Sequence, residues 1–126
     1  MTEQAKDLEG IRNTVDDYFL GMYHSDTDRL AKAFHSDTFL SGYFQGNFSR
    51  FSVTDWLEMV GKTEAPAEQG EAFDMNIVSI DMKENVAVVK VRDLYLGLWF
   101  TDYLTLIKMD DGWKIVNKSF HHEPKA

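Results

Sequence analysis

Residues 99–120 read WFTDYLTLIKMDDGWKIVNKSF, and this stretch decides the fold. Apolar residues alternate with polar ones on both sides of the turn sequence Asp110-Asp111-Gly112. The pattern predicts two long strands that pair as a hairpin. One face of the first strand is apolar apart from a single carboxylate and consists of Phe100, Asp102, Leu104 and Leu106. An aspartate in such a place must be solvated, hydrogen-bonded or protonated, so we expect the functional site to include it.

The first half of the chain has the periodicity of helices. Over residues 4–23, apolar residues recur at helical spacing, at Leu8, Ile11, Val15, Tyr18, Phe19 and Met22. This spacing predicts a long amphipathic helix. Shorter helices are expected at residues 27–34 and from Thr54 to Gly61, because capping residues stand at their ends.

Strand signals occupy most of the remaining chain. Residues 38–45 and 47–52 predict a hairpin, and residues 73–82 and 86–96 predict two strands before the last hairpin. Helices followed by four consecutive strands indicate an α+β fold, with three helices on the concave face of a curved antiparallel sheet. The length suits a single domain that spans residues 1–126.

The composition excludes several classes of function. The formal net charge is −8, and no cluster of Lys and Arg could neutralise phosphates, which argues against nucleic acid and anionic membranes as partners. Without cysteine the chain has no disulfide, no thiolate nucleophile and no cysteine-based metal site. Adjacent His121 and His122 would point to opposite faces of a strand, so we expect no metal site there, and no motif indicates a cofactor.

The amino-terminal residues are too charged for a signal peptide. No apolar run approaches the roughly 20 residues that are needed to span a bilayer. A cytoplasmic location is therefore the expectation.

Two stretches resemble the NTF2-like superfamily, which is also described as SnoaL/ketosteroid-isomerase-like or as the cystatin-like cone. Residues 18–42, YFLGMYHSDTDRLAKAFHSDTFLSG, are similar to its opening helix, acidic break, second helix and first strand. Residues 100–106, FTDYLTL, with DGWKI at 111–115, are similar to its last hairpin. Together they look most like the lumazine-binding branch. The resemblance implies an α+β cone with a cavity, but this fold hosts both enzymes and binding modules.

The resemblance also implies roles for two residues. Tyr18 falls where the ketosteroid isomerases of this superfamily carry an oxyanion-hole tyrosine, and Asp102 falls where they carry a protonated aspartic acid. Two such donors would stabilise a developing enolate in a dry cavity. The general base of those enzymes falls at Gly42, which has no side chain, so the set is incomplete. Tyr18 and Asp102 could equally anchor a ligand, or bond only to each other.

Other candidate site residues have two readings each. His35 stands beside Asp37 and could act in acid–base chemistry, but it could also cap the second helix. The large rings expected near the cavity are those of Trp56, Tyr95, Trp99, Trp113 and Phe120. They could line a ligand site or simply fill the core. Asn117 would lie on the cavity wall if the cone opens at that end, but it could also be a hydrogen-bonded residue at the edge of the sheet.

Three functions remain open from the sequence. The first is a homodimeric protein whose cavity binds a small apolar or aromatic ligand. The second is an isomerase- or dehydratase-type enzyme that uses Asp102, Tyr18 and His35. The third is a dimeric protein-interaction module. The dimer is expected because helices cover only one sheet face, and the other would carry Tyr103, Thr105, Ile107, Val116, Lys118 and Phe120.

Overall fold

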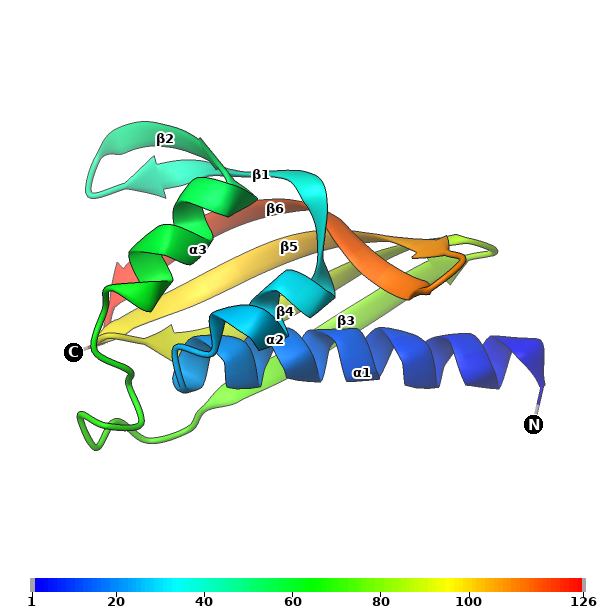
Figure 1. Ribbon diagram of the computed structural model, residues 1–126, viewed down its shortest axis with the longest axis horizontal. Helices are drawn as coiled ribbons and strands as arrows, with labels where there is room; N and C mark the ends of the chain where they lie inside the picture. Colours follow the sequence, from blue (N-terminus) through cyan, green and yellow to red (C-terminus); the bar gives the residue numbers. More distant parts are fainter. Residues whose placement is uncertain (1, 126) are drawn as a thin grey trace.

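The computed structural model describes residues 2–125, in which helices precede most of the strands (Figure 1). The elements are α1 (Glu3–Tyr23), α2 (Thr27–Ala33), β1 (Phe34–Phe44), β2 (Asn47–Ser52), α3 (Val53–Gly61), β3 (Met75–Lys83), β4 (Val86–Tyr95), β5 (Leu98–Met109) and β6 (Gly112–Pro124). Each predicted helix and strand is present, with ends that differ by a few residues. The α+β prediction is confirmed.

Local sequence sets where the helices begin. The side chains of Thr2, Asp26 and Ser52 each accept a hydrogen bond from a backbone N–H in the first turn of α1, α2 and α3, respectively. These caps satisfy amide groups that have no partner within the helix. Each helix therefore begins directly after a capping residue whose side chain accepts this hydrogen bond.

The six strands form one curved sheet in the order β2-β1-β6-β5-β4-β3. Strands β3 to β6 pair antiparallel with their neighbours, as predicted. The sheet is nevertheless mixed, because β1 runs parallel to β6. The β1–β2 hairpin, α3 and the carboxyl-terminal end of β6 gather at one end of the molecule, whereas α1 begins at the other (Figure 1).

A β-bulge in β6 reverses which side chains face the helices. Leu106 pairs with Ile115, whereas Thr105 pairs with Asn117, so Val116 is an extra residue in the ladder. One inserted residue moves every later side chain to the opposite face. Lys118 is consequently buried and Asn117 is exposed. The predictions that placed Lys118 and Phe120 on the outer face, and Asn117 on the cavity wall, are therefore wrong.

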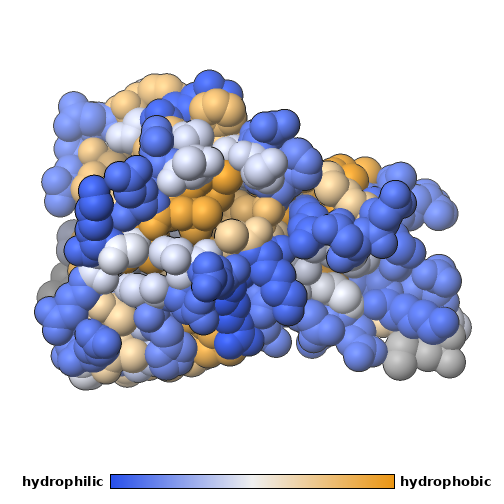
Figure 2. All heavy atoms as spheres, viewed as in Figure 1, coloured by the Kyte–Doolittle hydropathy of each residue, from blue (hydrophilic) through white to orange (hydrophobic). Residues whose placement is uncertain are grey.

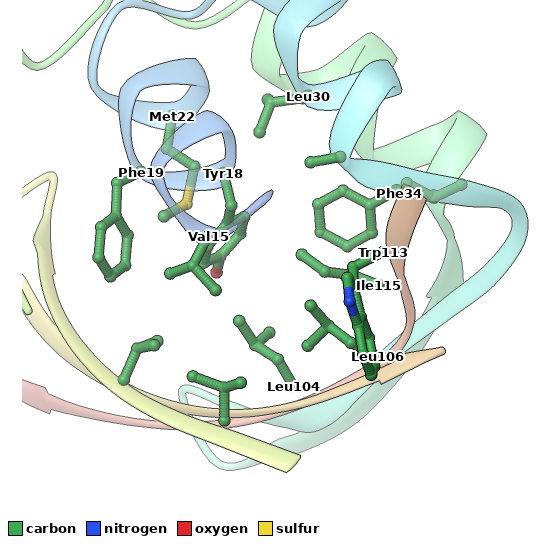
Figure 3. Packing of buried hydrophobic residues seen from close by; sticks show 14 of the residues in the cluster. Val15, Tyr18, Phe19, Met22, Leu30, Phe34, Leu104, Leu106, Trp113 and Ile115 are labelled. Carbon is green, nitrogen blue, oxygen red and sulfur yellow. The ribbon is translucent and has the colours of Figure 1, made fainter. Parts of the chain in front are cut away.

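The core lies between the helices and the concave face of the sheet. Figure 3 shows Val15, Tyr18, Phe19 and Met22 of α1 pointing toward the sheet residues Leu104, Leu106, Trp113 and Ile115. The outer face keeps large apolar groups in solvent, and Tyr103 is 47% exposed there. Among residues 2–125, no helix is long and apolar enough to cross a membrane.

Candidate functional site

A cavity of about 700 Å³ opens at the end of the molecule where α3 faces the sheet. Its walls come from α3, from the β1–β2 hairpin and from the adjoining ends of β4, β5 and β6. The lining is mostly apolar and aromatic, with Trp56, Tyr95, Phe100 and Phe120 supplying the rings. Figure 2 shows hydrophobic side chains in a recess between hydrophilic ones on the helical face. The volume and lining are typical of a small-molecule site.

Three ionisable side chains form a diagonal row across the sheet beneath this cavity. Asp102 lies on the central strand β5, opposite Val91 of β4 and Phe120 of β6. Asp93 of β4 pairs with Phe100, and Lys118 of β6 pairs with Leu104, so each lies one diagonal step from Asp102 on the inward face. Diagonal neighbours of this kind are within reach of one another. Asp93 and Lys118 line the cavity, whereas Asp102 is fully buried behind them.

Tyr18 connects α1 to this row. Its hydroxyl group donates a hydrogen bond of 2.6 Å to Oδ2 of Asp102, and both residues are 0% exposed. Figure 3 shows the Tyr18 hydroxyl pointing from α1 toward the sheet. Burial, followed by the negative charges of Asp102 and Asp93, raises the pKa of Tyr18 well above its ordinary value. Tyr18 is thus a neutral donor at any physiological pH.

Asp93 and Asp102 form a carboxyl pair. Oδ1 of each is buried and has no hydrogen-bond donor among residues 2–125. Burial raises the pKa of Asp93 well above its ordinary value, and the charge of Asp102 and a side-chain hydrogen bond to it act in the same direction. The positive charge of Lys118 opposes this rise. A hydrogen bond between two carboxyl groups requires one proton, and the raised pKa of Asp93 favours such a proton between the two groups.

Lys118 is an unusual cation because it is only 5% exposed. Its Nζ lies 4.7 Å from the ring centroid of Trp56, 5.0 Å from that of Tyr18 and 5.8 Å from that of Phe120. Aromatic faces attract cations at these distances. Among residues 2–125, no carboxylate forms a salt bridge with Lys118, and its Nζ makes no hydrogen bond. The amine group therefore faces the cavity without a direct polar partner.

A family model described as "Putative lumazine-binding" matches residues 6–121. The chain belongs to this family. Its α+β cone is the NTF2-like fold. A solved NTF2-like protein of unknown function from Silicibacter pomeroyi DSS-3 matches with a TM-score of 0.88 at 23% identity, covering 98% of this chain and 100% of that one. Another, from Shewanella baltica OS155, matches with a TM-score of 0.86 at 21% identity, covering 98% and 99%.

One relative with an assigned activity is similar over nearly its whole length. It is the aldolase FrzH from Cladobotryum sp, which is 25% identical over 123 residues. The match covers 96% of this chain and 95% of the aldolase. The family resemblance inferred from the sequence is confirmed, whereas the two solved structures are similar in fold alone.

The structure leaves no room for a side chain at Gly42, the position at which the resemblance to ketosteroid isomerases implied a general base. A Cβ atom added to Gly42 would lie 2.7 Å from the ring of Phe120 and closer still to the Phe120 carbonyl oxygen. Strand β6 therefore occupies the space that a carboxylate at this position would need. The carboxyl group that this chain does present to the cavity is Asp93, from a different strand.

The remaining predicted site residues fall in different places. Trp56 is buried and lines the cavity. Tyr95 also lines it, and burial and then the charge of Glu71 raise the Tyr95 pKa to about 12. Trp99 does not line the cavity, and the guanidinium of Arg92 stacks on its ring at 3.8 Å. His35 is the second residue of β1, its Nδ1 accepts a hydrogen bond from the Asp37 amide, and it is outside the cavity lining. Within residues 2–125 no cluster of carboxylate and histidine side chains could hold a metal.

Asp93 is the residue that sequence reasoning missed, although a signal was present. Asp93 continues the series of every second residue formed by Ala87, Val89 and Val91, and the alternation in β4 places this series on the inward face. The alternation in β4 therefore predicts that Asp93 is buried, just as the alternation in β5 predicts it for Asp102. Lys118 had no such signal, because its inward direction depends on the bulge in β6.

Proposed function

We propose that this protein binds a small, uncharged and largely apolar molecule in the cavity, with a polar group such as a carbonyl held by Asp93 and Lys118. The observation that carries the proposal is the floor of the cavity. There, among residues 2–125, a buried carboxyl oxygen of Asp93 lacks a hydrogen-bond partner and the Lys118 amine forms no salt bridge, while the surrounding walls are mostly apolar. Buried polar groups without partners cost stability, and a bound ligand would supply the missing bonds.

The charge of the site supports an uncharged ligand. We infer that the carboxyl pair of Asp93 and Asp102 shares one proton, because burial raises the pKa of Asp93, and that the positive charge of Lys118 balances the remaining negative charge. A ligand anion or cation would leave one charge uncompensated in an apolar cavity. A carbonyl oxygen could accept a hydrogen bond from Lys118 or from the protonated carboxyl group without any change in net charge.

Binding can be tested by titrating the protein with aromatic ketones and with lumazine while following tryptophan fluorescence, because Trp56 lines the cavity. We expect saturable quenching, and at least a tenfold weaker affinity after Lys118→Met or Asp93→Asn. Lys90→Met is the matched control, since the Lys90 Nζ lies 5.7 Å from the Tyr103 ring and does not line the cavity. Equal losses of ligand affinity in Lys90→Met and in Lys118→Met would contradict the proposal.

A second candidate function is acid–base catalysis next to a carbonyl group. It is favoured by the carboxyl pair, whose Asp93 faces the cavity and whose Asp102 is held by Tyr18. A raised pKa brings a carboxyl group closer to the pH at which it can both accept and donate protons. The aldolase relative is consistent with this chemistry. The test is deuterium exchange at the α-carbon of a bound ketone in D2O, which should exceed the buffer rate and disappear in Asp93→Asn.

A further inference from the structure

The side chain of Lys118 has surroundings that differ from those of a structural lysine. A structural lysine extends its amine to solvent or pairs it with a carboxylate. Lys118 does neither within residues 2–125, because it is 5% exposed and forms no salt bridge. Its amine lies instead against the rings of Trp56, Tyr18 and Phe120 and at the wall of the cavity.

The backbone is shaped to bring this amine inward. Without the extra residue Val116 in β6, Lys118 would point to the outer face, where its charge would be solvated. β-Bulges often re-aim a side chain next to a functional site. The same bulge points Asn117 and Ser119 outward, so the inward polar group at this part of β6 is a primary amine.

We propose that Lys118 is a nucleophile that forms an imine with an aldehyde or ketone held in the cavity. The inference rests on the proposed function, because the carbonyl compound must first bind there. A lysine in an apolar pocket is one of the settings in which an amine acts as a covalent catalyst on carbonyl substrates. The aromatic lining would enclose the apolar part of such a substrate, and the amine would meet its carbonyl carbon at the floor.

The atoms and charges of the step balance with the groups present. The Lys118 ammonium gives one proton to the carboxyl pair, and the neutral amine forms a bond to the carbonyl carbon. The carbonyl oxygen takes one proton from the amine nitrogen and one back from the carboxyl pair and leaves as water, and the product is a protonated imine with the same charge as the original ammonium. Asp93 is the member of the pair that lines the cavity, so we assign it the role of accepting and returning the proton, while the proton that the pair already shares moves to Asp102 and back.

Borohydride trapping tests this inference on the intact chain. The protein is incubated with hydrocinnamaldehyde and sodium cyanoborohydride, which converts an imine irreversibly into a secondary amine. Peptide mass spectrometry then gives the labelling rate of each lysine in one sample. Lys62 serves as the internal control, because its side chain is 76% exposed and outside the cavity lining. We expect Lys118 to be labelled at least tenfold faster than Lys62, with a rate that saturates in aldehyde.

The outcomes separate this inference from the binding proposal. Hydrocinnamyl alcohol has the same apolar part as the aldehyde but cannot form an imine. It should therefore bind in the cavity without reacting, and it should slow the labelling of Lys118 but not that of Lys62. If the alcohol binds but Lys118 is labelled no faster than Lys62, the imine is excluded and the binding proposal stands. If neither compound binds, both proposals fail. Asp93→Asn should slow labelling of Lys118 at least fivefold, and an unchanged rate would remove Asp93 from the proton transfer.

Discussion

The hydroxyl group of Tyr18 on α1 donates a 2.6 Å hydrogen bond to Oδ2 of Asp102 on β5, in a place from which solvent is excluded. This bond ties the first helix to the centre of the sheet and gives the buried carboxylate a donor. A hydrogen bond to a charged group contributes roughly 1.5–3 kcal/mol, and removing one partner leaves the other buried without compensation. The same hydrogen bond therefore stabilises the fold and fixes the position of Asp102 next to the cavity.

Tyr18→Phe should accordingly lower the free energy of unfolding by about 1–3 kcal/mol, because Asp102 would lose its donor. Urea denaturation followed by tryptophan fluorescence measures the change. Tyr103→Phe on the exposed outer face is the matched control and should change stability by no more than about 0.5 kcal/mol. A loss for Tyr18→Phe as small as that of the control would mean that the bond contributes nothing.

The uncovered outer face of the sheet leads to a prediction about assembly. Val86, Val88 and Tyr103 are each more than two-fifths exposed on this face. We propose that two copies pack their sheets together, because the contact would remove these groups from water. Light scattering should then give about twice the chain mass of 14.5 kDa.

That dimer can be tested with two substitutions that change the net charge by the same amount. Tyr103→Lys would bury an unpaired charge in the contact and should shift the population toward monomer. Glu58→Gln on α3 changes the net charge by the same amount at an exposed place on the other layer, and should leave the mass unchanged. A wild-type protein that stays monomeric at high micromolar concentration would exclude the dimer.

The sequence predicted the elements of this fold well, and the reason is visible in particular residues. Helical spacing from Leu8 to Met22 and strict alternation around Asp102 are direct signatures of elements with one buried face. Alternation cannot reveal a bulge, because the extra residue is fixed by pairing with other strands. The inward direction of Lys118 and the outward direction of Asn117 therefore needed the structure. The cavity also needed it, since its walls come from segments that are far apart in sequence.

The close approach of β6 to Gly42 makes this position a test of the packing. A Cβ atom there would collide with the ring and backbone of Phe120, so Gly42→Ala should destabilise the protein by about 1–3 kcal/mol. Gly61→Ala at the end of α3 is the control, because its Cβ would make only an ordinary 3.5 Å contact with Thr27. That change should stabilise by about 0.5–1 kcal/mol, since alanine favours the helix. Equal effects of the two substitutions in urea denaturation would contradict the packing described.

The last prediction concerns how stability depends on pH through Asp93. Burial raises the pKa of Asp93 well above its ordinary value in the folded protein, whereas in the unfolded chain it titrates near the usual value of ~3.9. A group with a raised folded pKa takes up a proton on folding. Its contribution to stability is fully present below the unfolded pKa and is lost as pH rises toward the folded pKa.

Asp93→Asn should therefore reduce the loss of stability that the wild type undergoes above about pH 4, because the amide cannot ionise. Asp81→Asn on β3 removes an exposed carboxylate and should leave the shape of the pH profile unchanged. The free energies of unfolding are measured in urea at a series of pH values, and NMR of the side-chain carboxyl carbons gives the pKa of Asp93 directly. An Asp93 that titrates near its ordinary pKa would show that it is solvated or ion-paired. The carboxyl pair would then share no proton, and the proposal of an uncharged ligand, which depends on that proton, would fail.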